Sequence, residues 1–153
     1  MEEKYTKLLE KADAWIAAHK EEFISEIQGL VRIPSVSRAD LAEPGAPFGP
    51  DCRRVLDYAL ERGRFYGFET IDHDGYAGSV CLGDTDAENS IGMIAHLDVV
   101  PVGDGWIYPP FEGVVHDNCV IGRGATDNKG QLVAVFQLLK IFKSLEIPLR
   151  YNP

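Results

Sequence analysis

Two stretches of the sequence hold side chains whose types and spacing suit metal chemistry. In the first, residues 94–106 ("IAHLDVVPVGDGW"), His96 and Asp98 stand two apart in an apolar run that ends at Pro101 and Gly103. Such a run predicts a buried strand leaving a sheet, and residues two apart on a strand point to the same side. A carboxylate beside an imidazole fixes its tautomer and raises its basicity, as a metal-binding histidine requires. The pattern therefore favours a ligand site at the carboxyl end of this strand.

The second stretch is residues 121–132, "IGRGATDNKGQL". Gly122 and Gly124 permit backbone conformations that a side chain would forbid. Asp127 falls just before an expected helix, so it is either the N-cap of that helix or a carboxylate placed in a cleft beside the first pair. The glycines match neither a Walker motif nor GxGxxG, which argues against a phosphate site.

Together the two stretches resemble a known family. "HLDVVPVGDGW" followed by "PF", with "GRGATDNKG" about 25 residues later, is similar to the zinc-dependent exopeptidases of the M20 metallopeptidase group. This group includes carboxypeptidase G2, aminoacylase, succinyl-diaminopimelate desuccinylase and bacterial dipeptidases. The segments "YAGSVCLG" and "GDGW" look closest in sequence to the dipeptidase branch. The resemblance covers essentially the whole chain and corresponds to the N-terminal part of the family.

The resemblance implies a role for each matching residue. His96 looks like a ligand of one zinc ion, and Asp127 looks like the carboxylate that bridges two zinc ions. Asp98 looks like the catalytic-site carboxylate that orients the histidine. Cobalt or manganese are alternatives to zinc. The family also implies a cis peptide bond between Asp127 and Asn128, with the Asp127 carboxylate facing the imidazole of His96, and a supporting role is open to Lys129.

A complete member of the family has further groups. These are a Glu-Glu pair that supplies the general base and a zinc ligand, a further acidic ligand, a distant histidine and an inserted lid or dimerisation domain. The Glu-Glu pairs of this chain, at residues 2–3 and 21–22, stand in N-terminal helical sequence. We therefore expect residues 1–153 to be the N-terminal part of the catalytic domain, without the lid domain or the C-terminal part, and to be inactive alone.

Three functions follow as hypotheses. The first is a dipeptidase that hydrolyses a peptide bond with a zinc-activated water. The second is an amidohydrolase that deacylates N-acyl amino acids, and the third is a non-catalytic remnant or binding module that keeps the fold. The substrate partner is accordingly a dipeptide or a small N-acyl amino acid.

The elements that must position these residues can be read from hydrophobic periodicity. Helices are expected up to Ile33, from about Asp51 to Tyr66, and from about Lys129 to Leu145. Strands are expected at 68–74, 76–83 and 90–100, with a hairpin around Asp117-Asn118. On the last helix, the expected inner stripe is Leu132, Val135, Phe136, Leu139 and Phe142. The predicted fold is α/β, an incomplete zinc-exopeptidase-like catalytic domain with a mixed sheet and helices on both faces.

Composition indicates which classes of partner and which cellular compartment to expect. A net charge of −9 argues against nucleic acid and anionic membrane as partners. Three separate cysteines without a CxxC pair favour reduced thiols, and the sequence predicts a cytoplasmic protein. An unpaired sheet edge in an incomplete domain predicts self-association.

Overall fold

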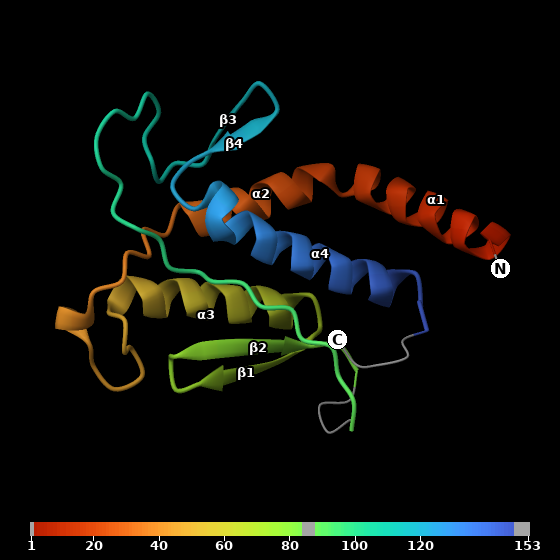
Figure 1. Ribbon diagram of the computed structural model, residues 1–153, viewed down its shortest axis with the longest axis horizontal. Coiled ribbons are helices and arrows are strands. Elements are labelled where there is room, and N and C mark those ends of the chain that lie inside the picture. The colour runs from red at the N-terminus through yellow and green to blue at the C-terminus, as the bar shows by residue number, and fades with distance from the viewer. Residues whose placement is uncertain (1, 84–87, 149–153) are drawn as a thin grey trace.

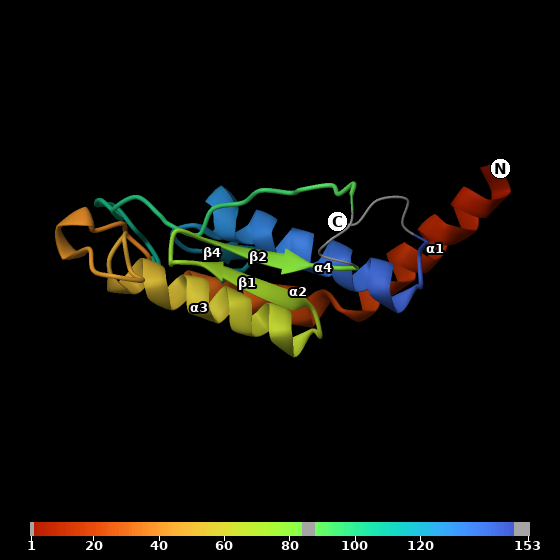
Figure 2. The ribbon, with the colours of Figure 1, turned by 90° about the horizontal axis from the view of Figure 1, so that it is seen from below.

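The structure, a computed structural model, describes residues 2–83 and 88–148, with side chains from residue 5 onward. Figures 1 and 2 show α4 running beside α2, while α1 extends away from the body toward the N-terminus. The helices are α1 (Glu2–Ala18), α2 (Lys20–Val31), α3 (Pro50–Phe65) and α4 (Gly130–Ser144), with short turns η1 (Ala39–Leu41) and η2 (Ala125–Lys129).

The helix boundaries follow from the local sequence. α2 ends at Val31, just before Pro34, because a proline disfavours helical geometry in the residue that precedes it. Pro50 occupies the start of α3, where its missing N–H is not needed, and Gly67 follows that helix with a φ of +75°. The three helices expected from periodicity are therefore confirmed to within a few residues.

The strands β1 to β4 form two antiparallel hairpins. β1 (Glu69–His73) pairs with β2 (Ala77–Cys81), and α3 packs against this hairpin, as Figure 2 shows. β3 (Val114–His116) pairs with β4 (Cys119–Ile121) across Asp117 and Asn118. Both turn residues have positive φ, which is the requirement of a tight two-residue hairpin turn. The predicted hairpin is confirmed.

The expected strand at 90–100, and the mixed sheet with helices on both faces built on it, are wrong for the described residues. The segment runs extended past the end of α2, and Val99 forms a parallel bridge with Val36. Within the described part of the chain, no backbone hydrogen bond joins residues 91–95 to another segment. An apolar run becomes a strand only where a neighbouring backbone supplies ladder partners. The α/β class itself is confirmed.

The core lies where α2, α3 and α4 meet. Its buried cluster is Ile27, Leu30, Val31, Ile33, Val55 and Val133. The predicted stripe of α4 is right for Phe136 and Leu139, but Val133 and Ile141 are also buried, and Val133 belongs to the same cluster as the buried residues of α2. Leu132 and Val135 are only half-buried and, together with Phe136 and Leu139, line an open groove of about 870 Å³ between α4, α3, β2 and residues 90–98.

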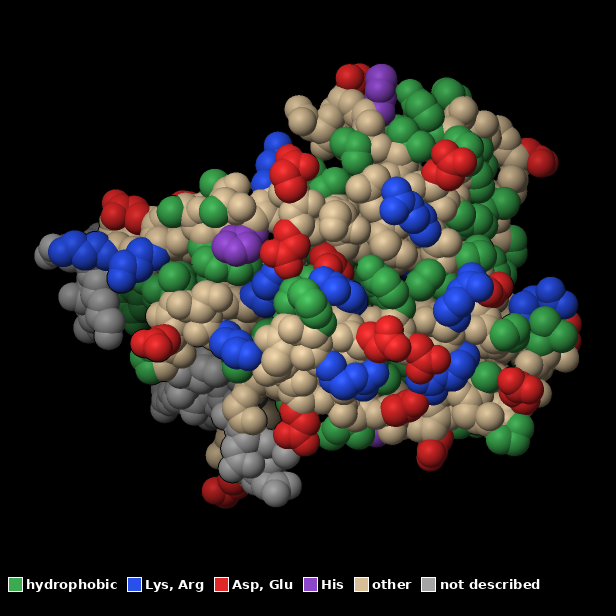
Figure 3. Space-filling view, turned by 180° about the vertical axis from the view of Figure 1, so that it is seen from behind, with side chains coloured by type: hydrophobic (Ala, Val, Ile, Leu, Met, Phe, Trp, Pro, Cys, Tyr) green, Lys and Arg blue, Asp and Glu red, His purple; other side chains and the backbone are tan. Residues whose placement is uncertain are grey.

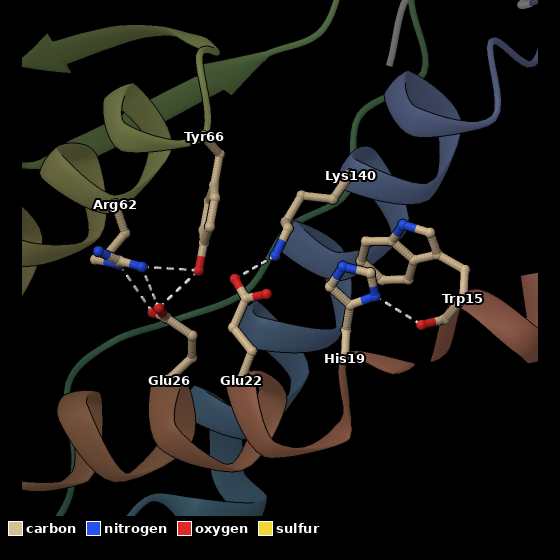
Figure 4. Close-up of polar contacts among 7 residues, drawn as sticks. All are labelled: Trp15, His19, Glu22, Glu26, Arg62, Tyr66 and Lys140. Atoms are coloured by element: carbon tan, nitrogen blue, oxygen red, sulfur yellow. Dashed lines mark hydrogen bonds and ion pairs between the residues drawn. The ribbon is translucent and has the colours of Figure 1, made fainter. Parts of the chain in front are cut away.

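A polar network fixes α2 relative to α3 and α4 (Figure 4). Glu26 of α2 is buried and accepts hydrogen bonds from Arg62 and from the hydroxyl of Tyr66, the latter at 2.6 Å. Lys140 of α4 pairs with Glu22 and lies 4.2 Å above the ring of Tyr66. These contacts hold the body of α2 in place, and its C-terminal end is the part that meets the candidate site.

The surface carries charges of both signs. Figure 3 shows acidic and basic side chains interspersed over the face that it presents. None of the helices in the described part of the chain is long and apolar enough to cross a membrane. Cys52, Cys81 and Cys119 are not joined in disulfides.

Candidate functional site

The candidate site joins the segment around His96 to the turn before α4. The imidazole Nε2 of His96 lies 2.9 Å from Oδ1 of Asp127, although 31 residues separate the two in sequence. Asp127 lies in η2, and the peptide bond from Asp127 to Asn128 is cis. The cis bond and the approach of this carboxylate to the imidazole are as the family resemblance predicts, and both predictions are confirmed.

Asp98 occupies the other side of the same imidazole. The Nδ1 atom of His96 lies 3.1 Å from the backbone carbonyl oxygen of Asp98 and 3.2 Å from its Oδ1. Both oxygens are acceptors, so they favour a proton on Nδ1. In the neutral ring this tautomer leaves a lone pair on Nε2 for a metal ion, whereas in the charged ring Nε2 carries a proton and donates to Asp127.

Ser35 anchors the segment that carries His96 and Asp98. Its side chain is wholly buried, and its hydroxyl donates to the carbonyl of Leu97 at 2.6 Å. Its own carbonyl accepts from the N–H of Val99 at 2.9 Å. Because these two bonds lie on either side of Asp98, they fix the backbone of the segment against the turn that follows α2.

The turn around Asp127 is closed by its own backbone. The N–H of Lys129 donates to the carbonyl of Gly124 at 3.0 Å, and Gly124 has a φ of +86°. A side chain at Gly124 would also meet Val99, since a Cβ atom there would lie 2.7 Å from its Cγ1. Asn128 links the two halves of the site, because its Oδ1 accepts from the backbone N–H of His96 at 3.3 Å.

Lys129 is a wholly buried cation at the end of this turn. Its Nζ donates to the carbonyls of Leu30, at 2.9 Å, and Ile33, at 2.7 Å. Burial lowers the pKa of Lys129 to about 8, and the nearby Cys52 and Asp98 oppose that shift only in part.

The surroundings of His96 favour the protonated form of its imidazole. Partial burial alone would lower the pKa of His96, but the hydrogen bonds and charges of Asp127 and Asp98 outweigh burial and raise it. The ring is therefore readily protonated when only carboxylates surround it. A metal ion at Nε2 would have to displace that proton.

The site opens on a small cavity of about 210 Å³. His96, Asp98 and Asp127 line it together with Arg123. The guanidinium of Arg123 donates to the carbonyl of Val102 at 3.0 Å and lies 5.3 Å from the ring of Trp106, so it holds the loop that borders the cavity.

The two candidate ligands suit zinc in kind. Imidazole nitrogen and carboxylate oxygen are both zinc ligands, and His96 and Asp127 present one of each to the same point. A protein zinc site normally uses three or four such groups. Within residues 2–83 and 88–148 no group of three or more His, Cys, Asp or Glu side chains is arranged to hold a metal ion. The residues present therefore fit part of a zinc site.

The sequence matches a peptidase family over the segment that carries the site. Residues 92–152 match the family model described as peptidase family M20/M25/M40. The chain is a relative of the M20 peptidases. It is 42% identical over 130 residues to "Putative dipeptidase YtjP" of Bacillus subtilis, and 37% identical over 132 residues to a "Putative dipeptidase" of Staphylococcus epidermidis. These alignments cover 85% and 86% of this chain and 28% of each relative.

The fold agrees with that relationship. The structure superposes on human carnosine dipeptidase 1 with a TM-score of 0.74 and 28% sequence identity, over 95% of this chain and 33% of the human protein. The M20 resemblance recognised from the two motifs is thus confirmed. The chain spans well under half the length of the M20 relatives that it matches.

All three sequence-predicted site residues meet in the structure, whereas two of their supports were missed. His96, Asp98 and Asp127 converge on one cavity. The hydrogen bonds that Ser35 and Asn128 make to the His96 segment were not predicted, because a serine after a proline and an asparagine before a helix carry no distinctive pattern. Their roles depend on segments 62 and 32 residues away.

Proposed function

We propose that the chain is part of a metal-dependent dipeptidase and that His96 and Asp127 are its contribution to a two-zinc site. His96 would hold one zinc ion through Nε2, Asp127 would supply the carboxylate shared by the two ions, and Asp98 would orient the imidazole. The observation that carries the proposal is the 2.9 Å approach of Nε2 of His96 to Oδ1 of Asp127. Cobalt and manganese are alternatives that accept the same kinds of ligand.

In this proposal the residues of the chain act by binding and by holding protons. The carbonyl and carboxylate of Asp98 keep the proton of His96 on Nδ1, so that Nε2 is free to coordinate. The carboxylate of Asp127 has two oxygens and can therefore face two positions. Bound zinc would supply Lewis-acid polarisation of the scissile carbonyl. None of the described residues is assigned as the general base.

The substrate and the domain assignment belong to the same proposal. The names of the bacterial relatives and of the human protein favour a dipeptide over an N-acyl amino acid. Residues 1–153 are assigned to the N-terminal part of the catalytic domain. The general base and the remaining ligands are assigned to sequence that the longer relatives have in addition, so the chain alone is expected to be inactive. The cytoplasmic location stays a prediction.

Zinc competition against a chromophoric chelator tests the proposal on this chain. With two protein ligands the wild type should bind zinc weakly and lose it on dialysis. His96→Ala and Asp127→Ala should each reduce the affinity at least about tenfold, since each removes one of the two ligands. His73→Ala, on β1, is the control and should leave the affinity unchanged. Equal zinc affinity in all four proteins would refute the assignment of the ligands.

A further inference from the structure

Lys129 is buried and has no carboxylate hydrogen-bond partner among the described residues. Its exposed fraction is zero, and its two hydrogen bonds go to backbone carbonyls. A buried ammonium group is costly unless its donors are satisfied, and an apolar side chain would fill the same space without that cost. The function proposed above gives this residue no part in the chemistry, so its position needs another explanation.

The two carbonyls belong to the C-terminal end of α2. Leu30 is in its last turn, and Ile33 follows the helix. The last carbonyls of a helix lack partners within it and attract cations. Lys129 therefore fastens η2 to the end of α2 through its side chain, while its backbone N–H closes the turn on Gly124 at 3.0 Å.

The other half of the site is fastened to the same turn. Ser35 holds the His96 segment through Leu97 and Val99. The stretch from Leu30 to Ser35 thus carries one anchor for Asp127 and one for His96. Both candidate ligands are therefore held relative to the same short stretch of chain.

We propose that Lys129 is a positioning residue that sets the place of the Asp127 carboxylate opposite His96 by tying η2 to the end of α2. Its metal-binding consequence rests on the proposed function, whereas the geometry of the His96–Asp127 pair does not. The structural alternative is that Lys129 only stabilises the core. In that case, its removal would lower stability and leave the His96–Asp127 contact unchanged.

The test compares Lys129→Met, an apolar side chain that removes the donors, with Lys129→Gln, a side chain of about the same length as Met that keeps a donor. Lys140→Met is the matched control, because Lys140 is also largely buried but lies near the other end of α4, where it pairs with Glu22. The first readout is metal-free: the nitrogen chemical shift of His96 Nε2 at fixed pH, which reports the hydrogen bond to Asp127. We expect Lys129→Met to move this shift toward the value in Asp127→Ala, Lys129→Gln to move it less, and Lys140→Met to leave it in place.

The second readout is zinc affinity in a double-mutant cycle. Lys129→Met should weaken zinc binding about tenfold in the wild-type background, as the loss of a supporting residue does. It should have no further effect in the Asp127→Ala background, because it acts through Asp127. Folded Lys129 variants with an unchanged Nε2 shift would overturn the proposal. If zinc binding does not depend on His96, the proposed function fails, and the metal-free shift still decides the role of Lys129.

Discussion

The Nε2 atom of His96 and the Oδ1 atom of Asp127 lie 2.9 Å apart, on two segments that are each tied to the end of α2 by a different buried side chain. Ser35 holds one segment and Lys129 the other. The pair is therefore placed by residues that touch neither of its reacting atoms. The predictions below separate the contact itself from its supports.

The first prediction concerns the protonation of His96. Its pKa is raised, on balance, by Asp127 and Asp98 against partial burial, so Asp127→Asn should bring it down. A base with a raised pKa stabilises the folded state below its ordinary pKa. That contribution disappears as the pH rises through the folded-state value. Titration of the imidazole resonance by NMR measures the change, with His73 as internal reference. An equal His96 pKa in both proteins would show that the carboxylate does not contact the ring in solution.

The second prediction concerns the anchor at Ser35. Ser35→Ala leaves the Leu97 carbonyl without its buried donor, so the free energy of unfolding should fall by about 1–3 kcal/mol. Ser37→Ala is the matched control, because Ser37 is exposed and two residues away, and it should be neutral. Urea unfolding measures both. Equal effects at the two serines would contradict the role of Ser35 as an anchor of the His96 segment.

The third prediction concerns the backbone before Asp127. Gly124 has a φ of +86°, and a methyl group there would press on Val99. Gly124→Ala should destabilise the fold by at least about 1–2 kcal/mol, which is the penalty of a left-handed conformation for a residue with a Cβ. Gly92→Ala meets nothing within 4 Å and serves as the control in the same thermal melts. A neutral Gly124→Ala would mean that this turn is not held as described.

The fourth prediction contrasts a buried ion pair with an exposed one. Glu26→Ala removes the partner of Arg62 and of the Tyr66 hydroxyl, and should destabilise the fold by about 3–5 kcal/mol. Asp40→Ala removes an exposed partner of Arg38, and should leave the stability nearly unchanged, because solvent screens an exposed ion pair. Chemical denaturation of both variants tests the difference. A small effect at Glu26 would show that the network in Figure 4 adds little.

The fifth prediction concerns association between copies of the chain. Ile94 is 99% exposed and lies where residues 91–95 make no backbone hydrogen bond to another described segment. An unpaired apolar edge promotes self-association, so the wild type should form oligomers that Ile94→Lys reduces. Ile107→Lys is the control, because it changes a similarly exposed isoleucine outside that edge. Sedimentation velocity distinguishes them, and a monodisperse wild-type monomer would refute the prediction.

The sequence by itself determined the local structure and which residues are candidates for the site. The periodicity from Asp51 to Tyr66, the turn at Asp117-Asn118 and the helix after Asp127 depend on neighbours within a few positions, and the structure follows them. His96, Asp98 and Asp127 could be named because their two motifs combine to resemble a family.

Tertiary structure decided what lies between those elements. The apolar run at 90–100 reads as a strand, but a strand exists only where a second backbone pairs with it, and periodicity says nothing about that partner. The burial of Val133 depends in the same way on where α2 packs. Lys129 looks like an ordinary first-turn lysine in sequence. It is buried because the end of α2, 96 to 99 residues away, offers two carbonyls to its ammonium group, and no local pattern encodes a hydrogen bond across that separation.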